Sequence, residues 1–122
     1  MARIMIVDDS AYARRVHRSI LERAGHEVTE ASTGMGAVES FLHETPDVVL
    51  LDLSMADMGG LQVLRTFREM NAKARVIVIS ADVQRSTADA VTAAGAERFL
   101  AKPANAEQLL GAVTDVLAVA PQ

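Results

Sequence analysis

Five polar side chains in this chain follow apolar segments and have types that suit phosphoryl chemistry. Asp8 and Asp9 follow the first apolar segment, Asp52 follows another, and Ser80 and Lys102 follow two more. If these segments are parallel strands of one sheet, their carboxyl ends lie at one rim, where ligands of such sheets bind. Three carboxylates, a hydroxyl and an ammonium at one rim would suit a divalent metal and a phosphoryl group.

A magnesium site is the first expectation from this group. Two carboxylates about 4 Å apart repel by ~1 kcal/mol in water and ~4 kcal/mol at an effective dielectric constant of about 20, so a cluster of them needs a cation. Mg²⁺ takes oxygen ligands, keeps several waters and favours phosphate. Asp9 and Asp52 could ligate it directly and Asp8 through water, and the backbone carbonyl of Ser54 could fill another position.

Asp52 is also the candidate nucleophile. Aspartyl phosphates are a known class of covalent intermediate. Phosphoryl transfer needs an in-line attacker and neutralisation of charge on the equatorial oxygens. Asp52 would attack, the metal would neutralise one oxygen, Lys102 a second, and Ser80 would donate a hydrogen bond to a third.

Strand and helix patterns alternate along the whole chain. Short apolar runs predict strands, and apolar residues at helical spacing predict the helices between them. The predicted strands are Arg3–Val7, Glu27–Ala31, Val48–Leu51, Val76–Ile79 and Arg98–Ala101. The predicted helices are Ala11–Ala24, Thr33–His43, Leu61–Met70, Arg85–Ala94 and a last one that runs to about Ala118. Strict alternation predicts an α/β domain with one doubly wound parallel sheet and helices on both faces.

Helix ends and helix faces give further expectations. Ser10 can cap the first helix, and Gly25 can end it in a left-handed conformation. Asn105 and Gln108 have the spacing of a capping box at the start of the last helix. In the first predicted helix, the residues expected to face inward are Ala13, Val16, Ile20 and Ala24. In the second, they are Ala37, Val38, Phe41 and Leu42. The histidines are interpreted as surface residues: His17, His26 and His43.

Composition narrows the class of protein. The chain has no Cys, which excludes disulfides and thiolate metal sites. Its net charge of −4 argues against direct nucleic-acid binding. The apolar segments are far shorter than the ~20 residues of a membrane span, and the first is too short for a signal peptide. We therefore expect one cytoplasmic domain, residues 1–122, without a membrane or nucleic-acid partner.

Taken together, the rim motifs resemble the receiver domain of response regulators, the phosphoacceptor module of two-component signalling, in its stand-alone, chemotaxis-regulator form. The matching motifs, spread over the entire chain, are Asp8-Asp9, Asp52, Ser80-Ala81 and Lys102-Pro103. The resemblance implies a flavodoxin-like, (βα)5 sheet with strand order 2-1-3-4-5. It also implies that Asp52 is phosphorylated, that the acidic pair binds Mg²⁺ and that Lys102 contacts the phosphoryl group.

The resemblance also implies a switch. Ser80 resembles the switch hydroxyl, and Phe99 resembles the aromatic switch that turns inward on phosphorylation. Phe99 has no hydroxyl, so its switching would work through packing. The Lys102–Pro103 bond is commonly cis in this family. Many receivers carry Met-Pro a few residues past the acceptor, whereas this chain has Met55-Ala56.

The predicted function is that of a phosphoacceptor rather than an enzyme that turns over other substrates. A histidine kinase or a histidine phosphotransfer protein would donate the phosphoryl group to Asp52 in a Mg²⁺-dependent reaction. The surface of the fourth helix, fifth strand and fifth helix would then change its affinity for a downstream protein target. The protein is expected to be a monomer or a weak dimer. The alternative is a receiver excised from a longer regulator with a DNA-binding or enzymatic output domain.

Two other function classes fit the residues less well. A phosphatase with an aspartyl-phosphate intermediate usually needs a second acid two residues after the nucleophile, where this chain has Ser54. A flavin-binding module of the same fold class needs a phosphate-cradling loop after the first strand, and Asp8-Asp9 would repel phosphate there.

Overall fold

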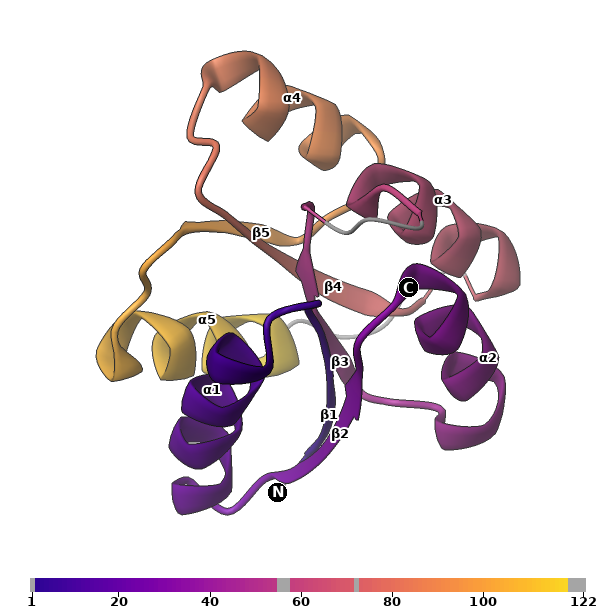
Figure 1. The fold of residues 1–122 in the computed structure, drawn as a ribbon. Helices are drawn as coiled ribbons and strands as arrows, with labels where there is room; N and C mark the ends of the chain where they lie inside the picture. The colour runs from indigo at the N-terminus through magenta and orange to yellow at the C-terminus, as the bar shows by residue number, and fades with distance from the viewer. Residues whose placement is uncertain (1, 55–57, 72, 119–122) are drawn as a thin grey trace.

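One parallel sheet organises the molecule (Figure 1). The computed structural model describes residues 2–54, 58–71 and 73–118. Its strands are β1 (Arg3–Val7), β2 (Glu27–Ala31), β3 (Val48–Asp52), β4 (Arg75–Ser80) and β5 (Arg98–Ala101). They pair in the order β2-β1-β3-β4-β5, all parallel, which confirms the predicted α/β fold and its strand order. β3 and β4 extend past the predicted ends, so Asp52 and Ser80 are the last residues of their strands.

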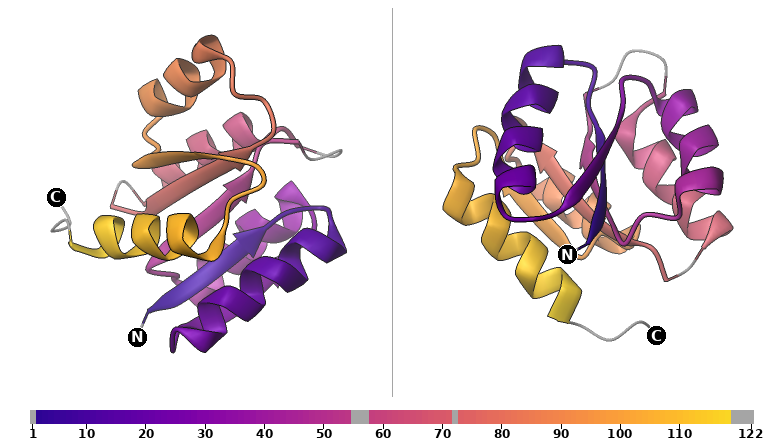
Figure 2. Two further views of the ribbon diagram at one scale, coloured as in Figure 1. Left: turned by 90° about the vertical axis from the view of Figure 1, so that its left-hand side faces the viewer. Right: turned by 90° about the horizontal axis from the view of Figure 1, so that it is seen from below.

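Helices connect the strands and cover both faces of the sheet (Figure 2). They are α1 (Ala11–Arg23), α2 (Gly34–Glu44), α3 (Gly60–Met70), α4 (Arg85–Ala93) and α5 (Ala106–Ala118). α1 and α5 pack on one face, and α2, α3 and α4 pack on the other. Within the described ranges, none of these helices has the length and apolar character needed to cross a membrane.

Each face of the sheet has its own apolar core. Successive residues of a strand point to opposite faces. In β1, Ile4 and Ile6 therefore pack beneath α1 and α5, whereas Met5 and Val7 pack beneath α2 and α3. Burial on both faces explains why the three inner strands, β1, β3 and β4, read as apolar runs rather than as alternating patterns.

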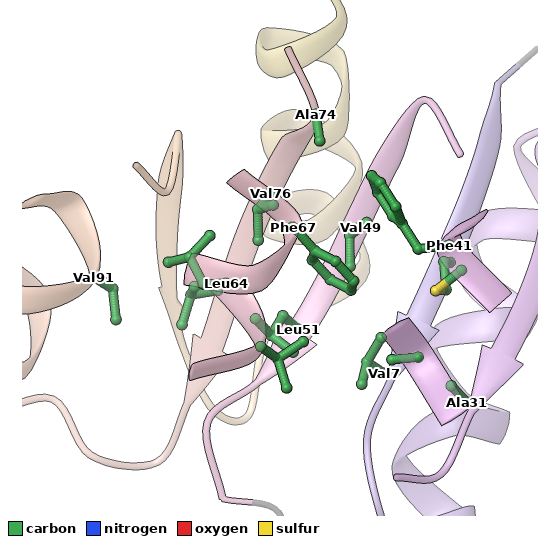
Figure 3. Packing of buried hydrophobic residues seen from close by; sticks show 14 residues of the cluster. Val7, Ala31, Phe41, Val49, Leu51, Leu64, Phe67, Ala74, Val76 and Val91 are labelled. Atoms are coloured by element: carbon green, nitrogen blue, oxygen red, sulfur yellow. The ribbon is translucent and has the colours of Figure 1, made fainter. Parts of the chain in front are cut away.

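Two aromatic rings join α2 to α3 in the core beneath α2, α3 and α4 (Figure 3). Phe41 of α2 and Phe67 of α3 stack with ring centroids 4.5 Å apart and an interplanar angle of 20°. Such a pair contributes about 1 kcal/mol beyond the area that it buries. The stack helps to hold both helices over the strands that carry Asp8 and Asp52.

The predicted helix caps are confirmed. The Ser10 hydroxyl accepts a hydrogen bond from the Ala13 N–H at 3.1 Å. The Gln108 side chain accepts from the Asn105 N–H at 3.0 Å, while the Asn105 side chain accepts from the Gln108 N–H at 2.8 Å, which completes the capping box. Gly25 has a φ of 92°, as a residue that ends a helix in the left-handed region should.

The inward faces of α1 and α2 differ from the prediction. His17 and Leu21 are the buried residues of α1, and His17 is only 6 % exposed, whereas Val16 is exposed. α1 is thus rotated by about one residue relative to the predicted stripe, because Leu21 must pack among the residues of the sheet and α5. Three further expectations were wrong: Ala24 and Leu42, expected to face inward, are exposed, and His26, expected at the surface, is half-buried.

Candidate functional site

Asp52 and Asp8 lie side by side at the carboxyl rim of the sheet. Asp52 ends β3, and the pairing of Val7 with Leu51 places Asp8 beside it on the neighbouring strand. Both carboxyl side chains are buried, with residues 3 % and 1 % exposed. The Asp8 N–H donates to the Ala31 carbonyl at 3.1 Å, which holds the backbone in line with β2. The sheet therefore fixes the two acids next to each other.

Asp9 completes a group of three acids. One carboxylate oxygen from each of Asp8, Asp9 and Asp52 lies within 4.8 Å of the others, and Asp9 is exposed. Oxygen donors at this spacing, with one side open to solvent, fit the coordination that Mg²⁺ prefers, in which several waters are kept. The structure brings together the three carboxylates that the sequence singled out as metal ligands.

Lys102 brings positive charge to this group from the far edge of the sheet. Its Nζ lies 2.9 Å from Asp8 Oδ2 and 3.5 Å from Asp52 Oδ2. The Lys102 N–H donates to the Ser80 carbonyl at 2.9 Å, which extends the pairing of β4 with β5 by one residue. The Lys102–Pro103 peptide bond is cis, the isomer that the resemblance implied.

The pKa values of Asp52 and Lys102 are both shifted at this rim. Burial and the nearby Asp8 charge raise the pKa of Asp52, although Lys102 and the Ser54 N–H act in the opposite direction. Burial alone would lower the pKa of Lys102, but its hydrogen bond to Asp8 and the charge of Asp52 outweigh burial and raise it. An isolated ion pair would lower the pKa of its acid. Here burial and the Asp8 charge outweigh Lys102, which lies closer to Asp8 than to Asp52, so the pKa of Asp52 rises.

Two serines lie beside Asp52. Ser80, the last residue of β4, is fully buried, and its Oγ accepts a hydrogen bond from the Asp82 N–H at 3.0 Å. Ser54 is exposed, and its N–H donates to Asp52 Oδ1 at 3.3 Å. Ser80 thus lies on the neighbouring strand, where its hydroxyl is close to the rim, and Ser54 binds the Asp52 carboxylate through its backbone N–H.

Phe99 lies farther from the rim, within β5. It pairs with Val78 of β4 and is half-buried against the core beneath α2, α3 and α4. This position is adjacent to the strand that ends in Ser80. Another sequence expectation, on the Met55-Ala56 pair, falls outside the described residues.

Sequence reasoning missed the contacts that orient Asp8. The Ser10 N–H donates to Asp8 Oδ1 at 2.9 Å, so the residue predicted only as a helix cap also holds the acid. Arg14 Nη1 donates to the Asp8 carbonyl at 2.7 Å, and its Nε pairs with Glu30 at 2.9 Å. The i, i+4 spacing of Ser10 and Arg14 on a helix was the available signal, because such residues share one face.

The chain matches the response regulator receiver domain over residues 4–114. It is 39 % identical to the chemotaxis protein CheY of Bacillus subtilis over 116 residues, covering 94 % of this chain and 97 % of that protein. It is 36 % identical to the sensory/regulatory protein RpfC of Xanthomonas campestris over 118 residues, covering 93 % of this chain but 16 % of that longer protein.

A solved structure agrees with this chain in fold. The CheX–CheY–BeF3–Mg²⁺ complex from Borrelia burgdorferi superposes with a TM-score of 0.92 at 29 % identity, covering 96 % of this chain and 90 % of that one. The family match covers the strands and the acids of the rim. With its 2-1-3-4-5 sheet and its three clustered aspartates, the chain belongs to the response regulator receiver domain family.

Proposed function

We propose that the protein accepts a phosphoryl group on Asp52 and acts as a signalling switch. The observation that carries the proposal is the position of Lys102, whose Nζ lies within 3.5 Å of the carboxylates of both Asp8 and Asp52. One cation shared by two buried acids leaves the site short of positive charge. A rim of this kind is suited to bind a divalent cation and a phosphoryl group together.

The reaction forms one bond and breaks one. A carboxylate oxygen of Asp52 attacks the phosphorus of a phosphohistidine, the bond from phosphorus to the imidazole nitrogen breaks, and the imidazole leaves with a proton from solvent. The product is an acyl phosphate. Water later attacks the phosphorus, which releases inorganic phosphate and restores the carboxylate. The protein thus promotes only its own phosphorylation and dephosphorylation.

The neighbouring residues stabilise charge on the transferred group. Lys102 turns from the two carboxylates to one phosphoryl oxygen, and the Ser80 hydroxyl donates a hydrogen bond to another. Asp8, Asp9, Asp52 and the backbone carbonyl of Ser54 would hold Mg²⁺, which neutralises charge on the phosphoryl oxygens when bound. Asp52 and Ser80 end their strands, and Asp8 and Lys102 directly follow theirs, so the sheet brings these groups together before transfer.

Partners follow from this chemistry. The donor is a histidine kinase or a histidine phosphotransfer protein, and the output is a changed affinity of the surface formed by α4, β5 and α5 for a downstream protein. Phe99 would move inward as Ser80 turns toward the phosphoryl group. The B. burgdorferi CheY structure in complex with CheX supports output through protein contact. The match to part of RpfC supports the alternative of a receiver within a longer regulator.

Intact-mass measurement tests the proposal directly. Acetyl phosphate and Mg²⁺ should add the mass of one phosphoryl group to the wild type, and EDTA should prevent the addition. Asp52→Asn should stay unmodified, whereas Asp89→Asn, which changes an exposed acid of α4, should be modified like the wild type. Equal labelling of Asp52→Asn and the wild type would overturn the proposal.

A further inference from the structure

Arg14 of α1 binds the backbone of the acidic pair rather than its carboxylates. Its Nη1 donates to the Asp8 carbonyl at 2.7 Å. This carbonyl and the Asp9 N–H belong to one planar peptide group, so the contact holds the link between the two acids. Asp8 is only 1 % exposed, and a buried carbonyl needs a donor from the protein. Arg14 supplies that donor.

Glu30 of β2 holds the same guanidinium on another side. Arg14 Nε lies 2.9 Å from Glu30 Oε1, and Arg18 Nη1 lies 2.6 Å from Glu30 Oε2. The Arg18 contact lowers the pKa of Glu30 most, and Arg14 acts in the same direction, so the acid is ionised. α1 lies beside β1 and β2 (Figure 2). Arg14 therefore ties the peptide group that follows β1 to the neighbouring strand, and its side chain is only 17 % exposed.

Asp9 depends on its backbone for its position. Within the described ranges, no hydrogen bond or ion pair holds its carboxylate, and the residue is exposed. The Asp8 carboxylate differs, because Oδ1 accepts from the Ser10 N–H and Oδ2 from Lys102. The peptide group between Asp8 and Asp9 sets the direction in which Asp9 leaves the strand. That peptide group is the one that Arg14 holds.

The arrangement also limits electrostatic repulsion. A guanidinium that paired with the rim acids would repel a bound cation and compete for their oxygens. Arg14 instead donates to a neutral carbonyl, and Glu30 offsets its charge. Arg14 can thus fix the peptide group without occupying a carboxylate of the rim.

We propose that Arg14 is a positioning residue that makes the rim selective for Mg²⁺ over Ca²⁺. The inference rests on the part of the proposed function in which Asp8, Asp9 and Asp52 hold Mg²⁺. Mg²⁺ demands near-ideal octahedral geometry, whereas Ca²⁺ accepts a larger and more flexible set of oxygen ligands. A carboxylate whose backbone is fixed therefore favours Mg²⁺, and a looser one reduces that advantage.

Titrations of the full chain with MgCl₂ and with CaCl₂ at constant ionic strength test this role, with the Asp9 amide chemical shift as the readout. Arg14→Met should weaken Mg²⁺ binding about tenfold or more, as replacement of a group that holds a metal ligand typically does. Ca²⁺ binding should weaken by a smaller factor, so the ratio of the Ca²⁺ Kd to the Mg²⁺ Kd should fall. Loss of a positive charge alone would strengthen the binding of both cations. Weaker binding therefore reports position and not charge.

Two variants separate the contact from the charge. Arg14→Lys keeps the charge, but an ammonium lacks the planar fork that binds the Asp8 carbonyl and Glu30 together, so Mg²⁺ binding should again weaken. Arg15→Met removes a positive charge from the exposed neighbouring position of α1, and its Mg²⁺ Kd should stay within about twofold of the wild type. If circular dichroism shows that Arg14→Met is unfolded, Arg14→Lys decides the question.

The outcomes distinguish this inference from the proposed function. Mg²⁺ binding of wild-type strength in Arg14→Met and Arg14→Lys would overturn the inference, while labelling of the wild type by acetyl phosphate would still uphold phosphoacceptor function. Equal weakening of Mg²⁺ and Ca²⁺ binding, or the same loss in Arg15→Met, would also overturn it. A wild type that binds Mg²⁺ selectively but stays unlabelled would overturn the proposed function and not the role of Arg14. A wild type that binds no Mg²⁺ would overturn both.

Discussion

Lys102 Nζ lies 2.9 Å from Asp8 Oδ2, although β5 and β1 are separated in the sheet by β3 and β4. The lysine side chain reaches across the ends of the intervening strands, and it passes within 3.5 Å of Asp52 on the way. Asp8 and Asp52 are buried, whereas Lys102 is partly exposed. Lys102 therefore supplies positive charge to both buried acids.

Lys102→Met should lower the free energy of unfolding by about 2 kcal/mol at pH 7 without Mg²⁺. Removing one partner of a buried ion pair costs about 3–5 kcal/mol, and we expect less here because solvent reaches the lysine. Urea denaturation followed by circular dichroism measures the change. Lys73→Met, which alters an exposed lysine, should change the stability by less than about 0.5 kcal/mol. Equal stability losses in the two variants would contradict the assigned role of Lys102.

Mg²⁺ should raise the Tm of the wild type by mass action. A ligand that binds only the folded state adds about 2.7 kcal/mol when its free concentration is about 100 times its Kd. Asp9→Asn removes one of the three clustered carboxylates and should abolish most of the shift, while Asp89→Asn should keep it. Differential scanning fluorimetry over a Mg²⁺ series checks this. An undiminished shift in Asp9→Asn would place the metal elsewhere.

The raised pKa of Asp52 predicts that its ionisation destabilises the fold. The folded-state pKa lies above the ordinary value of 3.8, so the unfolded chain loses this proton first as the pH rises. The protonated Asp52 carboxyl therefore contributes its full stabilisation of the folded state below pH 3.8, and this contribution is lost as the pH rises through the folded-state pKa. Asp52→Asn should thus be more stable than the wild type by about 1 kcal/mol at pH 7 without Mg²⁺, with no difference near pH 3. Chemical denaturation at both pH values measures this difference in the free energy of unfolding. A larger difference at pH 3 than at pH 7 would contradict the prediction.

The lowered pKa of His17 predicts that the folded protein loses stability in mild acid. Burial lowers its pKa most, with Lys102 acting in the same direction and Asp8 against it, so the unfolded chain gains a proton first as the pH falls below 6.5. The buried Nδ1 also has no hydrogen-bond partner among the described residues, which costs about 1–3 kcal/mol.

His17→Leu should therefore stabilise the protein by about 1 kcal/mol at pH 7, or about 4 °C in Tm, with a larger gain at pH 5. Thermal unfolding at the two pH values gives both numbers. His43→Gln, at an exposed position, should change neither value. A gain that is the same at both pH values would show that His17 does not titrate differently in the two states.

Two glycines with positive φ make a matched pair. A Cβ on Gly25, at φ +92°, meets nothing within 4 Å, so Gly25→Ala should cost only the conformational strain of about 1–2 kcal/mol. A Cβ on Gly95, at φ +105°, meets Arg68 Nε at 2.5 Å. Gly95→Ala should cost about 1–3 kcal/mol more, because it also displaces the guanidinium that binds backbone carbonyls. Equal costs in urea denaturation would show that Arg68 can move aside freely.

The sheet and the rim acids were predictable because each signal is local. A strand buried on both faces reads as an apolar run, and a reactive residue at its end is adjacent in sequence, as Val7 and Asp8 are. The cap at Ser10 follows from its residue type and position in the same way. Parallel pairing then brings the strand ends together without further information.

The remaining features depend on how elements sit against one another. His17 is inside because α1 is rotated on the sheet, and the hydropathy pattern favoured Val16 one residue away. Lys102 Nζ lies closer to Asp8 than to Asp52 because the lysine side chain extends from the end of β5 across the carboxyl ends of the other strands. The contacts of Asp82 depend on the turn between β4 and α4. None of these leaves a periodic signal in the sequence.

Asp8, Asp52, Ser80 and Lys102 lie at or directly after the carboxyl ends of strands, whereas α4 contributes one buried side chain, Val91, to the core. Under the proposed function, the groups that react and the surface that recognises a partner would evolve under separate constraints. Substitutions along α4 would then redirect the protein to a new partner without changing the residues of the rim.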